Sequence, residues 1–456
     1  MKRERLGSRL GFILLSAGCA IGVGNVWKFP WMVGTNGGGA FVLIYFLFLA
    51  ILGVPVLTME FSLGRASQKS PVKLYQELEK KGTKWHLHGY AAMIANYILM
   101  MFYTTVAAWM LQYFFKMAKS DFVGADAAKV SEIFSDVKSE PVMQIVFMGI
   151  IVVMGFVVCA IGLQNGLEKI TKIMMIALLL LIVILAVNSV TLDGAKEGLK
   201  FYLVPNFDTM KEVGIVKVIV SAMNQAFFTL SLGIGSMTIF GSYLSKDRAL
   251  MGEAVNVSIL DTFVAFTAGL IIFPACSSFG VDVGAGPALI FETLPLTFEH
   301  LPMGRLWGSL FFVFMSFAAL STVFAVFENI MSCTMDLTGW NRKKTAVVNG
   351  VAMFFLSIPC ILGFNVLKNF NPFGGNTNIM DLEDFIVSNI MLPIGSLIFV
   401  LFCVNRRYGW GFDKFMEEAN TGKGLKVKKW MKGYMTYVLP IIIVVIFIVG
   451  LIDFFK

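Results

Sequence analysis

The sequence has little charge and almost no histidine. Of its 456 residues, 14% are charged and 3 are histidine, whereas 57% are hydrophobic. A soluble domain carries about 25% charged residues, so this composition excludes a soluble globular protein. At roughly 20 apolar residues per crossing, the hydrophobic fraction is sufficient for ten or more membrane-spanning helices. The 37 Lys and Arg residues outnumber the 29 Asp and Glu residues. In a membrane protein this excess is explained by basic cytoplasmic loops, so we expect a lipid bilayer, and not a nucleic acid, as partner.

Signatures of catalysis and of metal clusters are also absent. The sequence has no Gly-x-Ser-x-Gly and no His-Glu-x-x-His motif, and His86, His88 and His300 fall in predicted loops. The cysteines stand singly in apolar runs, without the spacing of a zinc site or a disulfide framework. They are Cys19, Cys159, Cys276, Cys333, Cys360 and Cys403. We therefore expect packed or free thiols, no enzyme activity and no organic cofactor.

Eleven apolar segments are long enough to cross a membrane. They lie at about 10–34, 39–66, 88–117, 140–160, 167–190, 216–243, 249–277, 306–335, 345–364, 382–405 and 434–453. The first is too long and too rich in glycine for a signal peptide, so we expect it to stay in the mature protein. The pattern predicts an all-α membrane protein with eleven transmembrane helices in a single domain over 1–456.

The basic residues predict the orientation. They precede the first span and collect in the loops after spans two, four, six, eight and ten, all on one side of the membrane. The loop at 118–139, on the other side, balances its lysines with acidic residues. Since cytoplasmic loops are enriched in Lys and Arg, we predict a cytoplasmic N-terminus and, with an odd number of spans, an external C-terminus.

Two of the predicted helices contain clusters of small residues near their centres. The clusters are Gly18, Gly22, Gly24 and Asn25 in span one, and Ser231, Gly233, Gly235 and Ser236 in span six. One such cluster alone is better explained by close helix packing. Two clusters five spans apart favour a 5+5 inverted repeat, about 10–190 and 216–405, with broken helices 1 and 6 meeting at a midplane binding site. Helix 11, about 434–453, lies outside the repeat.

The predicted breaks would suit a zwitterion and an alkali cation. Half-helix N-termini offer N–H groups to an anion, and half-helix C-termini offer carbonyls to a cation. Uncharged oxygens near the breaks extend the donor set. They belong to Asn25, Thr229, Ser231, Ser321 and Thr322. A single Ser or Thr usually bonds its own helix, so the indication comes from the cluster.

Five ionisable residues lie in or near apolar segments, where charge is costly and usually functional. They are Lys28, Glu60, Asp261, Glu328 and Asp384. Lys28 and Asp384 could alternatively lie at the membrane interface. Asp261 has no basic residue within ten positions, so a bound cation is its expected partner. Glu60 has a structural alternative, the satisfaction of backbone donors, and we expect Glu328 to be hydrated at the cytoplasmic end of its helix.

Four long motifs carry a family resemblance. They run from Gly18 to Pro30, Asn36 to Phe41, Pro55 to Arg65 and Gln225 to Gly235. In this order they resemble the neurotransmitter:sodium symporter family, especially its bacterial eleven-helix amino-acid transporters, over essentially the whole chain. The resemblance implies a leucine-transporter-type fold and sodium-coupled amino-acid symport by alternating access across the bacterial plasma (inner) membrane.

The resemblance also implies two sodium sites. The first would be held by Ala20, Asn25, Thr229 and Asp261 together with the substrate carboxylate. The second would be held by Gly18, Ile21, Ala318, Ser321 and Thr322. Because the first sodium shares the substrate carboxylate, the binding of each would strengthen the binding of the other. Asp261 stands where many members carry asparagine, so its charge would replace chloride and transport would be chloride-independent.

A substrate pocket is implied on the same basis. The amino-acid backbone would lie against Ala20, Gly22, Val23, Gly24, Tyr103, Phe228, Thr229 and Ser231. The side chain would be surrounded by Leu99, Val23, Ile234, Thr322 and Val326. This second group has no fixed charge, so we expect a neutral hydrophobic or aromatic L-amino acid.

The implied gates lie on both sides of the pocket. Tyr103 and Phe228 would form the outer lid, and Lys28 with Asp384 the outer charged pair. The cytoplasmic pair would be Arg3 with Asp336, helped by Ser242 and Tyr243. Lys28 replaces the usual arginine, so the outer pair lacks a guanidinium fork. Ile176 stands where some bacterial relatives have a helix-breaking proline. The resemblance therefore does not establish whether this helix unwinds to form the inner water path.

Two alternatives remain at this stage. A ligand sensor or ion channel on the same scaffold would have the same residues, and proton coupling through Glu60, Asp261 or Glu328 would fit the same transport class. The sequence does not determine the preferred amino acid, the ion stoichiometry or the oligomeric state.

Overall fold

The computed structural model describes residues 4–280, 289–299, 301–375 and 377–455. Within these ranges the regular structure is helical, with two isolated β-bridges and no strand. Nine helical segments there are long and apolar enough to cross a membrane, and each begins and ends within four residues of its predicted bounds. They are Gly39–Ser67, His86–Ala118, Pro141–Ile161, Leu163–Val190, Leu250–Phe279, Gly304–Thr338, Arg342–Leu362, Ile379–Val404 and Met431–Ile452.

The two remaining predicted spans are not straight helices. A helix pair, Arg9–Ala20 and Gly24–Thr35, is bent by 54° at its break and gives a tenth candidate span. The predicted span at about 216–243 is divided into two helices, and its apolar first part, Ile215–Thr229, is too short to cross a membrane alone. The all-helical membrane architecture is therefore confirmed, whereas the count of eleven stays a prediction.

The helices are numbered in chain order, with short π-helical segments labelled η. The first half of the chain contains α1 (Arg9–Ala20), η1 (Gly24–Lys28), α2 (Phe29–Thr35), α3 (Gly39–Phe48), η2 (Leu49–Gly53), α4 (Val54–Ser67), α5 (Pro71–Leu78), α6 (His86–Ala118), α7 (Ala127–Ser139), α8 (Pro141–Ile161), η3 (Leu163–Glu168), α9 (Lys169–Val190), α10 (Ala195–Leu203) and α11 (Phe207–Val213). The second half contains α12 (Ile215–Thr229), α13 (Ser236–Ser242), α14 (Leu250–Phe279), η4 (Leu289–Thr293), α15 (Leu294–Glu299), α16 (Gly304–Thr338), α17 (Arg342–Leu362), α18 (Ile379–Phe385), η5 (Ile386–Met391), α19 (Leu392–Val404), α20 (Phe412–Ala419), α21 (Met431–Gly433), η6 (Tyr434–Val438) and α22 (Leu439–Phe454).

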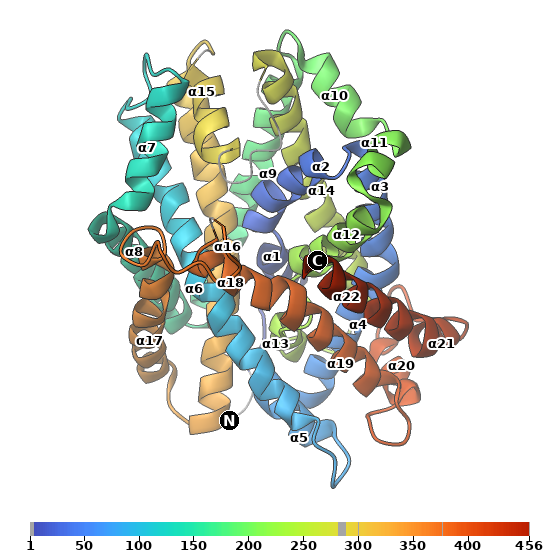
Figure 1. The fold of residues 1–456 in the computed structure, drawn as a ribbon. Helices are drawn as coiled ribbons and strands as arrows, with labels where there is room; N and C mark the ends of the chain where they lie inside the picture. The colour runs from blue at the N-terminus through green and yellow to red at the C-terminus, as the bar shows by residue number, and fades with distance from the viewer. Residues whose placement is uncertain (1–3, 281–288, 300, 376, 456) are drawn as a thin grey trace.

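The centre of the molecule is formed by α1, α6, α13 and α16, and Figure 1 shows α1 in the middle of the bundle. The outer helices α8, α9, α17 and α22 expose aliphatic side chains instead. Val153, Leu180, Val347 and Ile441 are between 60% and 67% exposed. Apolar faces of this extent are expected where helices contact lipid.

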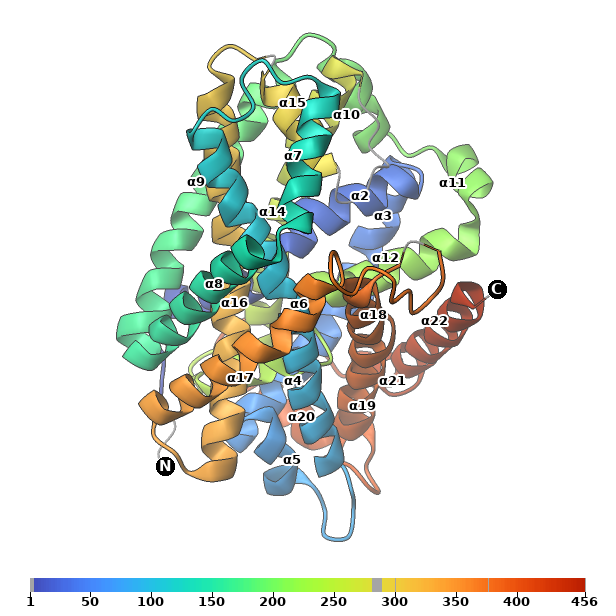
Figure 2. The same cartoon turned by 60° about the vertical axis from the view of Figure 1, so that its left-hand side comes forward.

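The N-terminal end of the described chain lies at the same end of the bundle as α5 and α20 (Figures 1 and 2). Helices α7, α10 and α15 lie at the opposite end in both views. The basic loops around α5 and α20 therefore share a side with the N-terminus, as the charge pattern predicts. The assignment of that side to the cytoplasm stays a prediction.

Glycine lets α13 pack directly on α4. A Cβ atom at Gly64 would overlap the carbonyl oxygen of Thr238, and one at Gly241 would overlap the carbonyl oxygen of Phe61. The two backbones therefore touch, which is typical of small residues between membrane helices. This contact attaches the second half of the broken sixth span to the second span.

The structure tests the predictions for the cysteines and for two of the three histidines. All six cysteines lie within the described ranges and are buried, as expected of packed thiols, and none forms a disulfide. The histidine prediction was wrong, since His86 and His88 lie in the first turn of α6; the His88 ring nitrogen Nδ1 is 2.6 Å from the hydroxyl of buried Tyr75. Because Leu87 and the turns after it continue the apolar pattern, α6 extends back over both histidines. His300 lies outside the described residues.

Candidate functional site

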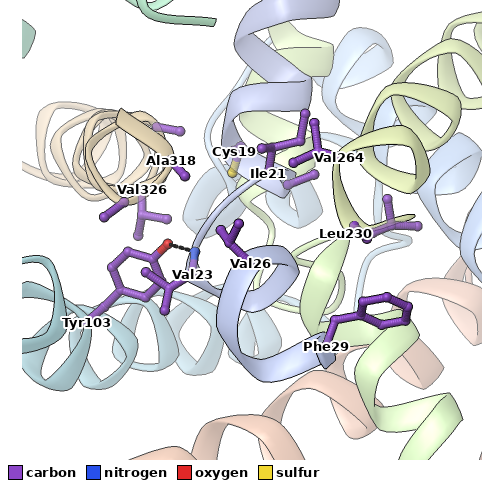
Figure 3. Packing of buried hydrophobic residues seen from close by; sticks show 14 of the residues in the cluster. Cys19, Ile21, Val23, Val26, Phe29, Tyr103, Leu230, Val264, Ala318 and Val326 are labelled. Carbon is purple, nitrogen blue, oxygen red and sulfur yellow. Dashed lines mark hydrogen bonds between the residues drawn. The ribbon is translucent and has the colours of Figure 1, made fainter. Parts of the chain in front are cut away.

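The first break separates α1 from η1. Ile21 leaves helical geometry with ψ 103°, and the chain becomes helical again by Gly24. A Cβ at Gly22 would overlap the hydroxyl groups of Tyr103 and Thr322, so only glycine fits there. Figure 3 shows the non-helical link and the Tyr103 hydroxyl, which accepts a hydrogen bond of 2.9 Å from the backbone N–H of Val23.

The second break separates α12 from α13. Ser231, Gly233 and Gly235 have φ values of 50°, 88° and 74°, which helical residues do not adopt. The Gly233 N–H donates to Oε1 of buried Glu60 at 2.7 Å, so this carboxylate replaces a missing helical acceptor. The Ser231 hydroxyl donates to the carbonyl of Cys19 at 3.2 Å and thereby joins the two breaks.

Three of the four residues predicted for the first sodium site are in contact. Asn25 Nδ2 donates to Asp261 Oδ1 at 2.7 Å, and the Thr229 hydroxyl lies 3.0 Å from both carboxylate oxygens of Asp261. All three are buried, and the fourth, Ala20, is the last residue of α1 and is also buried. Among the described residues, Asp261 has no cationic side-chain partner. Its partners there are an amide and a hydroxyl, neither of which would neutralise an ionised carboxylate.

The residues predicted for the second sodium site also converge. The Ser321 hydroxyl lies 3.2 Å from the carbonyl oxygen of Ile21 and 2.9 Å from that of Ala318. The Thr322 hydroxyl lies 3.3 Å from the carbonyl oxygens of Gly18 and Ile21. Five uncharged oxygens thus gather between α1 and α16, and oxygen is the ligand that hard cations prefer.

A small cavity lies between the breaks. Nine of the twelve residues predicted for the substrate line it, namely Ala20, Gly22, Gly24, Leu99, Tyr103, Phe228, Ser231, Ile234 and Thr322. Its volume is about 20 Å³, which exceeds the space that one water needs.

The other three predicted substrate residues lie just outside this lining. Val23 lines the neighbouring outer cavity, Thr229 faces Asp261, and Val326 is fully buried in α16. Sequence reasoning missed Cys19, Val387 and Leu392, which line the small cavity. The last two come from the tenth predicted span, where the carbonyl of Leu392 lies against Gly233. No polar or glycine cluster in that span indicated the contact.

In the structure, the residues of the predicted outer lid lie close to those of the predicted outer charged pair. A second cavity of about 140 Å³ lies above the first, and Tyr103 and Phe228 line both cavities, so they separate them. Lys28 Nζ lies 2.8 Å and 2.9 Å from the two carboxylate oxygens of Asp384 and 3.0 Å from the Ser388 hydroxyl. It also lies 4.2 Å from the centre of the Phe228 ring, so the ion pair rests on the lid.

The predicted cytoplasmic pair is only partly described, because Arg3 lies outside the described residues. Asp336 Oδ2 accepts a hydrogen bond of 2.8 Å from the Ser70 N–H. The Ser242 hydroxyl donates to the Ile239 carbonyl of its own helix, and the Tyr243 hydroxyl donates to Glu328 at 2.7 Å. Of these helpers, Tyr243 therefore links α13 to α16.

Glu328 was expected to be hydrated, and this prediction was wrong, because the residue is fully buried. Arg342 binds its two oxygens at 2.6 Å and 2.9 Å, and the same guanidinium lies 3.2 Å from Glu4. A bidentate arginine explains how a carboxylate tolerates complete burial. Sequence reasoning missed this pairing because Arg342 was counted among the basic residues of a loop, whereas it opens α17.

Comparisons with known proteins agree with this arrangement. A family model described as the sodium:neurotransmitter symporter family matches residues 3–129 and 120–456. The chain is 36% identical to an uncharacterised sodium-dependent transporter of Bacillus subtilis (strain 168), with 99% of both chains covered. It is 33% identical to another from Methanocaldococcus jannaschii, over 97% of this chain and 89% of the relative.

A solved structure extends the likeness to the fold. The crystal structure of MhsT in complex with L-phenylalanine has a TM-score of 0.89 and 36% sequence identity to this chain, and the match covers 98% of this chain and 99% of that one. The family groups sodium-dependent transporters, not enzymes. The chain belongs to the sodium:neurotransmitter symporter family.

Proposed function

We propose that this chain is a chloride-independent, sodium-coupled symporter that carries neutral hydrophobic or aromatic L-amino acids into a bacterial cell. The observation that carries the proposal is the convergence of both helix breaks on one small cavity, beside buried Asp261. Free backbone groups at the breaks suit the charged ends of an amino acid. Two sodium ions would be bound by the residue sets described above.

The substrate class follows from the lining of the cavity. Leu99 and Ile234 present aliphatic side chains to it, and none of its lining residues is charged. A basic or acidic side chain would be buried there without a partner, which is costly. MhsT, whose fold is similar, was solved with L-phenylalanine, and this supports an aromatic or large aliphatic substrate.

Chloride independence follows from Asp261. Its carboxylate is buried beside Asn25 and Thr229, so a fixed negative charge is already present where the first sodium would bind. A sodium ion there would be neutralised without a mobile anion.

The proposed architecture is one domain with inverted repeats over about 10–190 and 216–405 and an eleventh helix at about 434–453. It would span the plasma membrane with the N-terminus in the cytoplasm and the C-terminus outside. Exchange of the outer pair Lys28–Asp384 for the cytoplasmic pair Arg3–Asp336, helped by Ser242 and Tyr243, would give alternating access.

Uptake into proteoliposomes tests the proposal. We expect accumulation of radiolabelled L-phenylalanine above the external concentration when an inward sodium gradient is imposed, and loss of accumulation when choline replaces sodium. Replacement of chloride by gluconate should leave the rate unchanged. Sodium-dependent binding without accumulation would instead indicate a sensor on this scaffold.

The same vesicles distinguish sodium coupling from proton coupling. With choline outside and an imposed pH gradient, we expect no uptake. Full uptake under these conditions would remove sodium from the mechanism and assign coupling to protons.

A further inference from the structure

A buried amide on α6 holds the second break at Ile234, next to the residue that Glu60 holds. Asn96 Nδ2 donates to the carbonyl oxygen of Ile234 at 2.7 Å, inside the break, and to the carbonyl of Ala92 at 2.7 Å, one turn earlier on α6. Its Oδ1 accepts from the Ser236 hydroxyl at 3.0 Å and from Asn329 Nδ2 at 3.1 Å. We call Asn96, Ser236 and Asn329 the amide clamp.

The amide clamp is fully satisfied and has only one orientation. Asn96 uses both of its N–H donors and accepts two hydrogen bonds. Rotation of the amide by 180° would point Oδ1 at the carbonyl oxygens of Ala92 and Ile234, so that acceptor would face acceptor. Asn96, Ser236 and Asn329 are at most 1% exposed, so water does not compete with these bonds.

The amide clamp lies close to the cavity along two helices. Leu99, which lines the cavity, follows Asn96 by three residues on α6, and Thr322, which also lines it, precedes Asn329 by seven residues, about two turns, on α16. Residues three apart share a helix face. The third element is the break itself, where Ile234 contributes its carbonyl to the clamp and its side chain to the cavity lining.

We propose that Asn96 is a positioning residue that fixes the depth of the side-chain pocket and thereby sets which amino acids the transporter prefers. The inference rests on the proposed function. The break has no repeating hydrogen bonds between Leu232 and Ser236, and Gly233 and Gly235 make it pliable. The hydrogen bond from Asn96 to Ile234 therefore holds the Ile234 side chain at a fixed distance from Leu99. Without this hydrogen bond, the Ile234 side chain, which forms the floor of the pocket, can move away from Leu99. The pocket then distinguishes less well between small and large substrate side chains.

A second buried amide provides a matched control. Asn349 on α17 accepts a hydrogen bond of 2.8 Å from the Tyr97 hydroxyl and donates to the Thr334 hydroxyl at 3.1 Å. Like the amide clamp, this cluster joins α6 to α16, and Tyr97 is the residue after Asn96. Within the part of the chain that the structure describes, the side-chain hydrogen bonds of Asn349 go to Tyr97 and Thr334 and not to the break, so Asn349→Ala removes a buried amide without touching the pocket floor.

The test is competition binding on the purified full chain in sodium, with L-phenylalanine and L-alanine displacing radiolabelled L-phenylalanine. For Asn96→Ala we expect the ratio of the alanine Kd to the phenylalanine Kd to fall about tenfold, while the sodium concentration for half-maximal binding stays within about twofold. Asn349→Ala should keep the ratio of the unsubstituted chain. An unchanged ratio in Asn96→Ala, or an equal change in both variants, would overturn the proposal.

Two further measurements keep the result decisive. If Asn96→Ala does not fold, Ser236→Ala removes one donor to Asn96, and we expect its ratio to fall about threefold; no change there overturns the proposal. Hydrogen exchange of residues 230–240 is measured without substrate. Faster exchange in Asn96→Ala than in Asn349→Ala supports the clamp, and equal exchange overturns it. Absence of amino-acid binding by the unsubstituted chain would refute the proposed function. The hydrogen-exchange comparison would still test whether Asn96 holds the break.

Discussion

At the scale of single residues, the site depends on how buried polar groups are partnered. Asp261 has an amide and a hydroxyl, Glu60 has a backbone N–H, and Glu328 has a guanidinium. The first of these three is left with uncompensated charge beside an uncharged oxygen cluster, whereas Glu328 is neutralised by its partner. The same functional group, a buried carboxyl, therefore has different roles, which its partners determine.

The charge of Asp261 can be removed without a change of shape. For Asp261→Asn we expect the sodium concentration for half-maximal uptake to rise roughly tenfold or more, because a buried carboxylate attracts the ion far more than an amide does. Uptake should also become stimulated by external chloride. Sodium titrations of radiolabelled uptake, with chloride or gluconate, measure both effects.

Asp384→Asn is the control for this substitution, since it alters a carboxylate at the outer pair, 37% exposed, and should leave the sodium requirement within about twofold. An unaltered sodium requirement in Asp261→Asn would show that the first sodium does not lie beside this residue.

Lys28 allows a test of the outer lid. It joins Asp384 to the ring of Phe228, so Lys28→Gln should loosen the lid and speed the release of bound amino acid to the outside several-fold, on the scale of a partly buried ion pair. Lys28→Arg keeps the charge and should release substrate no faster than the unsubstituted chain. Dilution of radiolabelled complex into excess unlabelled substrate gives the rates, and equal rates for Gln and Arg would contradict the role of the charge.

At the scale of helices, the interruptions were accessible to sequence reasoning because small residues must supply the conformations that they require. Gly233 and Gly235 adopt positive φ, and Gly22 leaves room for two hydroxyl groups. The contribution of the tenth span was not accessible in the same way. Val387 and Leu392 are ordinary apolar residues, and only packing against Gly233 brings them to the cavity. Arg342 was missed for a related reason, since helix α17 begins earlier than its apolar pattern does.

The contact between α4 and α13 is a second helix-scale feature that can be tested. Gly64→Ala would place a methyl group on the carbonyl oxygen of Thr238, and the backbones would have to separate. We expect destabilisation of about 1–3 kcal/mol or more and loss of uptake, since overpacked cores lose stability on this scale. Thermal unfolding of the purified protein in detergent measures the loss.

Gly433→Ala is the matched substitution, because a Cβ there meets no atom within 4 Å and the residue is helical. It should leave the melting temperature unchanged or slightly higher, since alanine favours helix over glycine. Equal effects of the two substitutions would argue against a tight contact at Gly64.

At the scale of the whole molecule, the composition and the loop charges were enough to predict an all-helical membrane protein, and nine predicted spans agree with the structure to within four residues. The short helices between spans were not predicted, because α7, α10 and α11 are amphipathic or polar and resemble loops by hydropathy. The closed geometry of the cavity also could not be predicted, since it depends on helix positions at a scale finer than any spacing rule.

The predicted orientation can be tested from outside the cell. The native cysteines are buried, so a membrane-impermeant maleimide should label introduced thiols with little background. Lys129→Cys on α7 should react in intact cells, and Lys81→Cys, beyond α5, should react only after permeabilisation, because positive loops stay in the cytoplasm. The reverse labelling pattern would invert the topology.

Thr322 links two parts of the site that are otherwise separate. Its hydroxyl belongs to the oxygen cluster with Gly18 and Ile21, and its side chain also lines the small cavity. A bulky substrate side chain that presses on Thr322 would disturb a sodium ion bound at the proposed second site, whereas a small side chain would leave that ion in place. Two amino acids that bind equally tightly should then be transported at different rates, because each would change the rate at which the sodium ion dissociates.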